Sequence, residues 1–181
     1  MRKVLQLIAP AILLLIVTLP YSSQAKEITL NNVPTQVYFS PGGGCIEAIV
    51  GELNRAKKEI LVQAYSFTSQ PIAKALVDAH KRGLRTEIVL DKSQRGEKYS
   101  AADFTAHMGV PTYIDSSHAI AHNKIMVIDQ ETVITGSFNF TKAAEDRNAE
   151  NILIIKSREL AKEYLDNWEK HKGHSEKYEG R

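Results

Sequence analysis

Residues 122–139 read HNKIMVIDQETVITGSFN and predict two β-strands joined by a tight turn. Residues 123–128 and 132–135 are rich in Ile and Val, and the polar residues between them form the turn. Because side chains alternate along a strand, His122, Lys124 and Met126 face one side. The hairpin therefore places an imidazole and an ammonium group in the same space.

The end of the second strand predicts a matching polar pair. Ser137 and Asn139 are two positions apart and can share a face, whereas Phe138 points the other way, into the core. Gly136 permits a close backbone approach at this junction. An imidazole, a fixed positive charge, a hydroxyl and an amide form an oxyanion-binding set without a metal. Such a set suits the equatorial oxygens of a phosphodiester.

Asp129 has the opposite strand parity to His122 and Lys124. Its carboxylate is therefore expected to face away from the proposed site. We interpret Asp129 as a structural residue that pairs with a turn amide or a neighbouring cation.

The residues around the hairpin alternate between period-two and period-3.6 patterns. Strands are predicted over residues 36–39, 59–65, 85–90, 111–114 and 150–155. Helices are predicted over residues 45–57, 101–107 and 159–170, and another begins after Ser69 and ends at Gly83. The alternation predicts an α/β fold, a layered α/β/α domain with a central mixed β-sheet. The tail from His171 is polar and predicted to fray.

The N-terminus has the pattern of a secretory signal peptide. Arg2 and Lys3 precede an apolar run over residues 4–19, and Ser-Gln-Ala at residues 23–25 supplies a cleavage site. A retained membrane anchor is the alternative, although the apolar run is short for a bilayer span. We therefore predict a signal peptide over residues 1–25, a single domain over residues 26–181, and a periplasmic or secreted protein.

Removal of the signal peptide would change the charge of the chain. Of the 23 basic residues, Arg2 and Lys3 leave, so 21 basic residues face 21 acidic ones. A phosphate-rich partner would then need local clusters of positive charge rather than net charge. Candidate clusters are residues 55–58, 81–85 and 92–98, each of which is equally typical of a solvated surface.

Three other features were weighed as sites. The run Gly42-Gly43-Gly44 lacks the residues of a nucleotide-binding loop and is better interpreted as a turn that opens a helix. Cys45 is the only cysteine, so no internal disulfide is possible, and it is expected to be buried. His118 and His122 are four residues apart, but they lie in a loop and strand without a third ligand, so no metal site is predicted.

Aromatic residues near strand ends could stack on nucleic-acid bases. Phe67 and Tyr99 are equally typical of stacking and of packing, whereas Tyr65 is expected in the core.

The spacing of the hairpin residues resembles a known motif. The pattern is His122-x-Lys124, four intervening residues, Asp129, six intervening residues, and Gly136-Ser137-x-Asn139. It is similar to the HKD motif of the phospholipase D superfamily. The chain also resembles the small bacterial endonucleases of that superfamily, the Nuc type. Further matching segments are FSPGGGC (39–45), VQAYSFTS (62–69), ALVDAHKRG (75–83), LDKSQ (90–94) and NAEN (148–151).

The resemblance implies a reaction and an assembly. It implies a non-specific endonuclease that hydrolyses phosphodiester bonds of DNA, and of RNA as an open alternative, through a phosphohistidine and without metal or cofactor. Because the chain holds one motif, a homodimer would join two motifs at its two-fold axis. One His122 would attack phosphorus and the other would protonate the leaving oxygen. Lys124 and Asn139 would bind the substrate's non-bridging oxygens, Ser137 would support the site, and Glu150 would orient the imidazole.

Two other functions were considered. A phospholipase D-type lipid phosphodiesterase would use the same site, but we predict no exposed aromatic-rich loop for membrane docking and no stable membrane association after signal cleavage. A non-catalytic nucleic-acid binder would retain the fold, but intact His122 and Lys124 and the neutral charge argue against it.

Overall fold

The computed structural model describes residues 25–181. The predicted signal peptide therefore lies outside the described residues, apart from Ala25. In the described part of the chain, no helix has the length and apolar character needed to cross a membrane.

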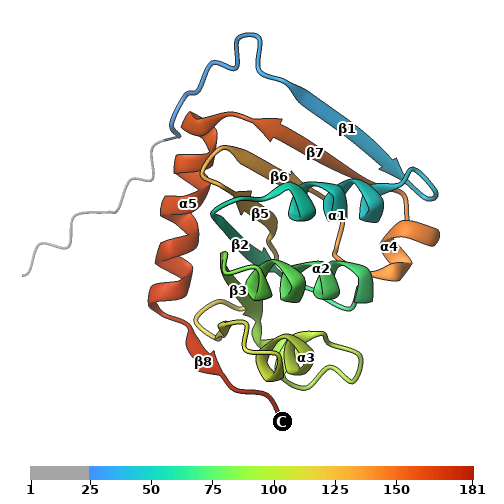
Figure 1. The fold of residues 1–181 in the computed structure, drawn as a ribbon, viewed down its shortest axis with the longest axis vertical. Coiled ribbons are helices and arrows are strands. Elements are labelled where there is room, and N and C mark those ends of the chain that lie inside the picture. The colour runs from blue at the N-terminus through green and yellow to red at the C-terminus, as the bar shows by residue number, and fades with distance from the viewer. Residues whose placement is uncertain (1–24) are drawn as a thin grey trace, which may run out of the picture.

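Eight strands within the described residues form one sheet in the order β1-β7-β6-β5-β2-β3-β4-β8 (Figure 1). β2, β3 and β4 are parallel, and the other neighbouring pairs are antiparallel, which confirms the predicted mixed sheet. The strands are β1 (Thr35–Ser40), β2 (Glu59–Ala64), β3 (Arg85–Asp91), β4 (Thr112–Asp115), β5 (Lys124–Ile128), β6 (Thr132–Gly136), β7 (Glu150–Lys156) and β8 (Glu176–Tyr178).

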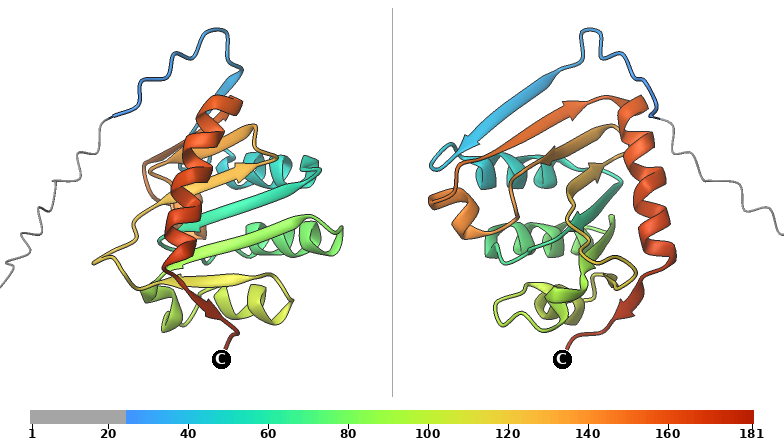
Figure 2. Two further views of the ribbon diagram at one scale, coloured as in Figure 1. Left: turned by 90° about the vertical axis from the view of Figure 1, so that its left-hand side faces the viewer. Right: turned by 180° about the vertical axis from the view of Figure 1, so that it is seen from behind.

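Helices cover both faces of the sheet, as the layered fold class predicts. α1 and α2 lie on one face, and α5 crosses the strands on the other (Figure 2). Trp168 anchors α5, because its ring is fully buried and its Nε1 donates to the Val62 carbonyl at 2.8 Å. The helices are α1 (Cys45–Arg55), α2 (Gln70–Lys81), α3 (Ala102–His107), α4 (Lys142–Asp146) and α5 (Arg158–Gly173), with a 3-10 turn η1 (Lys92–Arg95).

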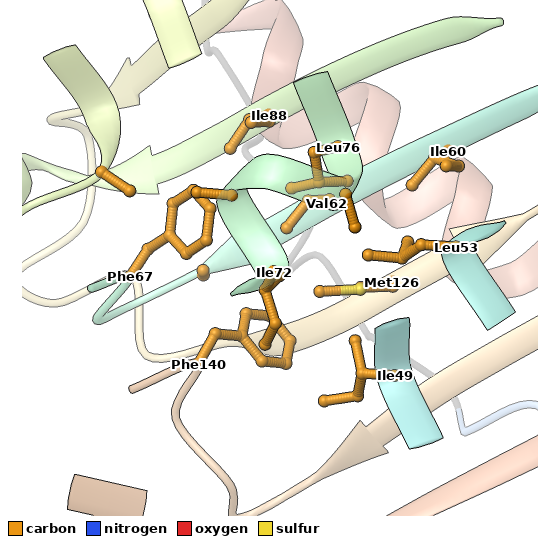
Figure 3. Close-up of a cluster of buried hydrophobic side chains, with 14 of the residues drawn as sticks. Ile49, Leu53, Ile60, Val62, Phe67, Ile72, Leu76, Ile88, Met126 and Phe140 are labelled. Atoms are coloured by element: carbon orange, nitrogen blue, oxygen red, sulfur yellow. The ribbon is translucent and has the colours of Figure 1, made fainter. Parts of the chain in front are cut away.

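The larger core lies between the sheet and the helices α1 and α2 (Figure 3). The predicted apolar stripe of α2 is buried there, and Cys45 is buried as expected. Met126 of β5 points into the same core, so this face of β5 is the one that also carries Lys124. Side chains labelled in Figure 3 include Ile49, Leu53, Ile60, Val62, Ile72, Leu76 and Ile88.

The prediction that the C-terminal tail frays is wrong. Residues 176–178 form β8, which pairs antiparallel with β4. Tyr178 is buried, and its hydroxyl donates to Asp103 of α3. Arg181 adds an ion pair with the same carboxylate at 2.9 Å. A polar sequence can form an edge strand when one aromatic ring and a few ion pairs attach it to the sheet.

Candidate active site

Four strands begin or end side by side at one end of the sheet, which we call the site edge. β2 ends beside the start of β5, with Ala64 opposite Lys124. β6 ends beside the start of β7, with Gly136 opposite Ile152. Because these neighbours are antiparallel, the residues that precede β5 and follow β6 emerge at the same edge. The antiparallel pairing of β5 and β6 therefore brings His122 and Lys124 to the same edge as Ser137 and Asn139.

Lys124 and His122 lie against one aromatic ring. The Lys124 Nζ is 5.2 Å from the ring centroid of Tyr65, and the His122 and Tyr65 centroids are 4.5 Å apart. Lys124 Nζ also donates to the His122 carbonyl at 2.8 Å. Lys124 is buried, with 7% of its surface exposed, whereas the His122 side chain is exposed. A buried cation and an accessible imidazole thus lie against the same aromatic ring.

Burial lowers the pKa of Lys124, and the nearby Glu150 carboxylate opposes this effect. An ammonium group that has lost water gains more from an anion than an exposed one does. A phosphate oxygen at this edge would supply that anion.

Ser137 and Asn139 have different surroundings. The Ser137 hydroxyl accepts from the Asn151 backbone N–H at 3.1 Å and donates to Asn151 Oδ1 at 3.3 Å, so it joins β6 to β7. The Asn139 Oδ1 is buried without a hydrogen-bond partner among the described residues. Phe138 between them is fully buried, as predicted. Asn139 therefore keeps an unpaired amide at the edge, while Ser137 supports the backbone.

Gly136 is required by a close approach of the chain. A Cβ at this position would lie 2.1 Å from the Asn151 carbonyl oxygen, a distance that no side chain tolerates. The junction of β6 with β7 therefore depends on a glycine before Ser137.

Asp129 lies at the opposite end of β5 from the site. Its carboxylate accepts backbone N–H bonds from Lys57, Lys58 and Glu59 at 2.9, 2.7 and 3.0 Å. It holds the β5–β6 turn against the turn between α1 and β2. The structural interpretation made from its parity agrees with this position.

Glu150 begins β7 at the site edge and accepts a hydrogen bond from Asn148 Nδ2 at 3.3 Å. Within residues 25–181, no hydrogen bond joins Glu150 to His122 of the same chain. Its predicted role in orienting the imidazole remains a prediction.

A groove of about 1480 Å³ extends from this edge along α2 and α3. Tyr65 and Asn139 lie among its lining residues, together with Tyr99 and Phe104. Its basic lining residues are Lys74, Lys81, Lys142 and Arg147, and its acidic ones are Asp78 and Glu97. Lys74 forms an ion pair with Asp78, and Lys142 forms one with Asp146. Three of these cations were missed from the sequence, because α2 and α4 are brought together only by the fold.

The structure corrects the prediction for Tyr65 and decides between the two alternatives for Phe67. Tyr65 was expected in the core but lines the groove, because β2 ends one residue earlier. Phe67, which was left open, is fully buried and forms a β-bridge with Phe140.

The basic cluster at residues 92–98 is largely engaged within the chain. Arg95 forms an ion pair with Glu176 at 2.7 Å, and Lys92 donates to the His118 carbonyl at 3.0 Å. Lys98 lies over the Tyr99 ring. Arg95 and Lys92 therefore support the fold rather than the groove.

The glycine run is a structural turn, as interpreted. The backbone N–H groups of Gly44 and Ile46 donate to the Glu145 carboxylate at 3.0 and 2.8 Å. These donors open α1, where an anion would otherwise bind, and a carboxylate of the chain already occupies them.

Comparison with known proteins agrees with this geometry. The family model described as "Cardiolipin synthase, PLD-like domain" matches residues 49–172. The chain therefore belongs to the phospholipase D superfamily of phosphodiesterases.

Three relatives show which proteins this chain is similar to. The crystal structure of Nuc from Salmonella typhimurium, a phospholipase D family member, has 39% sequence identity and a TM-score of 0.78, and the match covers 81% of this chain and 98% of that one. A Rickettsia felis protein named phospholipase D is 45% identical over 130 residues, which are 72% of this chain and 65% of that protein. A mitochondrial cardiolipin hydrolase from Xenopus tropicalis is 31% identical over 118 residues, 65% of this chain and 56% of that one. The chain thus spans about two thirds of the Rickettsia relative and just over half of the Xenopus relative.

Proposed function

We propose that this chain is a non-specific endonuclease that hydrolyses phosphodiester bonds of DNA, with RNA as an open alternative, and needs no metal for the reaction. One observation carries the proposal: an exposed His122 and a buried Lys124 both lie against Tyr65, and Tyr65 lines a groove that also holds Lys81 and Arg147. A basic groove can bind a polyanionic backbone along its length. Exposed aromatic rings such as that of Tyr99 can stack on the bases. The similarity to Nuc over nearly the whole of that chain supports it.

The reaction would run in two displacements. A ring nitrogen of His122 attacks phosphorus and forms a P–N bond, while the P–O bond to the leaving oxygen breaks. That oxygen takes a proton from His122 of a second copy. Water then attacks phosphorus and gives its proton to the second imidazole, and cleavage of the P–N bond regenerates both histidines.

Lys124 and Asn139 would bind the non-bridging oxygens during both steps. Lys124 supplies a desolvated positive charge, and the NH₂ group of the Asn139 amide can donate to a phosphate oxygen. Both contacts strengthen as negative charge gathers on the equatorial oxygens.

The second imidazole requires a second copy of the chain. Exposed apolar side chains near the site edge offer an interface: Ile120 lies two residues before His122, and Phe39 of the edge strand β1 pairs in register with Asn151. Their exposed fractions are 58% and 65%. A symmetric dimer through this edge would bury them and bring the two His122 side chains together.

A lipid phosphodiester is the second candidate substrate. The groove exposes some apolar side chains, because Tyr99, Phe104 and Met108 are 71%, 45% and 37% exposed. The names of the Rickettsia and Xenopus relatives point the same way. Lys81 and Arg147, which form no ion pair among the described residues, extend the positive charge of the groove beyond the site and favour a polyanion over a single head group.

A parallel assay on the two substrates tests the proposal. The purified protein is incubated with supercoiled plasmid DNA, and separately with phosphatidylcholine and cardiolipin vesicles, each with excess EDTA. We expect plasmid nicking with EDTA present and no lipid hydrolysis. His122→Ala should abolish nicking, whereas His107→Ala, which removes an exposed histidine outside the site, should not. Hydrolysis of lipid alone, or complete loss of nicking under EDTA, would overturn the proposal.

The predicted export of the protein also remains a proposal. We infer from residues 1–25 that the enzyme acts in the periplasm or outside the cell on exogenous nucleic acid. N-terminal sequencing of the protein recovered from a periplasmic extract would check the cleavage after Ala25.

A further inference from the structure

Four metal-ligand side chains gather on the α5 side of the loop that leads to His122. Asp115 ends β4, His118 lies in the following loop, His171 lies in the last turn of α5, and His174 follows that helix. The Asp115 side chain is fully buried, and one ligand atom from each residue lies within 4.8 Å of all the others. The sequence predicts no metal site at His118, because no third ligand is evident near His118 and His122. His171 and His174 lie more than 50 residues later, in a segment expected to fray.

The three imidazoles converge on one carboxylate oxygen. Asp115 Oδ2 lies 2.7 Å from His171 Nδ1, 3.0 Å from His118 Nδ1 and 3.2 Å from His174 Nε2. In a tetrahedral zinc site with bonds of about 2.0–2.1 Å, ligand atoms are about 3.3 Å apart. Small rotations of His118 and His174, which are 44% and 37% exposed, would open the space for an ion. His171 is 14% exposed and is fixed by its helix.

The donor set selects the class of ion. Three imidazole nitrogens and one carboxylate suit zinc and its neighbours, whereas calcium and magnesium prefer sites made of oxygen alone. A further hydrogen bond orients the Asp115 carboxylate, because its Oδ1 accepts from the Ser117 backbone N–H at 3.0 Å. Such outer contacts orient the ligands of a metal site.

We propose that Asp115, His118, His171 and His174 form a binding site for one Zn²⁺ ion. The ion joins β4, the loop of residues 116–123 and the C-terminal end of α5. This loop ends at His122, so the bound ion fixes the segment that carries the attacking imidazole. The ion lies outside the site at the edge of β5 and does not take part in the displacement at phosphorus. Zinc binding itself does not depend on the proposed nuclease reaction and can be tested without it.

Titration of the tag-free protein with ZnCl₂ tests the site. After removal of metals with EDTA and desalting, calorimetry should give one Zn²⁺ per chain, and thermal unfolding should show a higher Tm with zinc than without it. Replacement of zinc by Co²⁺ should give the visible absorption of a tetrahedral cobalt complex.

Variants separate coordination from a simple hydrogen-bonded cluster. The double variant His171→Ala/His174→Ala should weaken zinc binding by at least about 100-fold and lose the zinc-dependent rise in Tm. His107→Ala, a histidine of α3 outside the cluster, should bind zinc as the wild type does. His118→Ala, at the most exposed ligand, provides a second test if the double variant does not fold. Absence of zinc binding by the wild type, or unchanged affinity in these ligand variants, would show that the four residues form only a hydrogen-bonded cluster.

Discussion

The ammonium group of Lys124 lies where a hydrocarbon side chain would be the more stable choice. Its surroundings are the Tyr65 ring, the His122 carbonyl and the core side of β5. Since burial lowers its pKa, the charged form is destabilised in the folded protein. Retention of a charge there is expected where an anion must be bound.

Lys124→Met should therefore separate activity from stability. We expect nicking to fall by at least about 100-fold, because a fixed charge on the phosphate is lost, while the Tm at pH 7 does not fall. The folded-state pKa is lowered, so the unfolded chain binds more protons. The free energy of unfolding of the wild type should then rise as the pH approaches about 10.4, the pKa of lysine in the unfolded chain. The variant should lack this rise. A clear fall in Tm for Lys124→Met would contradict the account.

Asp129→Ala should have the opposite effect. Loss of the acceptor for three backbone N–H groups should lower the free energy of unfolding by about 1–3 kcal/mol, with the rate per folded molecule unchanged. Denaturant unfolding and nicking rates below the transition measure the two effects. A large loss of rate at unchanged stability would instead indicate a catalytic aspartate.

At the scale of elements, β8 decides how the C-terminal end of the chain is held. β8 pairs with β4, so that Tyr178 lies opposite Thr112. The Asp103 carboxylate accepts a hydrogen bond from the Tyr178 hydroxyl and forms an ion pair with Arg181. The hydrogen bond from Tyr178 lowers the pKa of Asp103, against a smaller opposing effect of burial, and Arg181 lowers it further.

Asp103→Asn should weaken this attachment in a pH-dependent way. The pKa of Asp103 is lower in the folded protein than in the unfolded chain, where it is about 3.9. Asp103 therefore stabilises the fold above about pH 3.9, and this stabilisation is lost as the pH falls through the folded-state pKa. The Tm of the wild type should exceed that of the variant at pH 7, and the difference should vanish on acidification. An equal difference at pH 7 and pH 3 would show that the charge of Asp103 is irrelevant.

Some elements could be predicted from the sequence and others could not. The hairpin of β5 and β6 was predictable because its pattern is local and alternates strictly, and the same parity separated Lys124 from Asp129. β8 was missed because its stability comes from contacts with Asp103, some 75 residues earlier in the chain. The groove was missed because Lys74 of α2 and Arg147 after α4 share no sequence pattern.

At the scale of the whole molecule, the described chain holds one histidine, one lysine and one asparagine of the proposed site. A two-step displacement needs a second imidazole to protonate the leaving oxygen. The exposed Phe39 and Ile120 side chains near this edge provide an apolar surface that a second copy would cover. Two chains would therefore share one active site.

Activity of a mixed dimer tests this claim most directly. Wild-type and His122→Ala chains carrying different tags are refolded together, and the mixed dimer is isolated by two affinity steps. A shared site needs both imidazoles, so nicking by the mixed dimer should fall by at least about 100-fold, close to the His122→Ala homodimer. Half of the wild-type rate, or full activity from a chain that sediments as a monomer, would contradict the account.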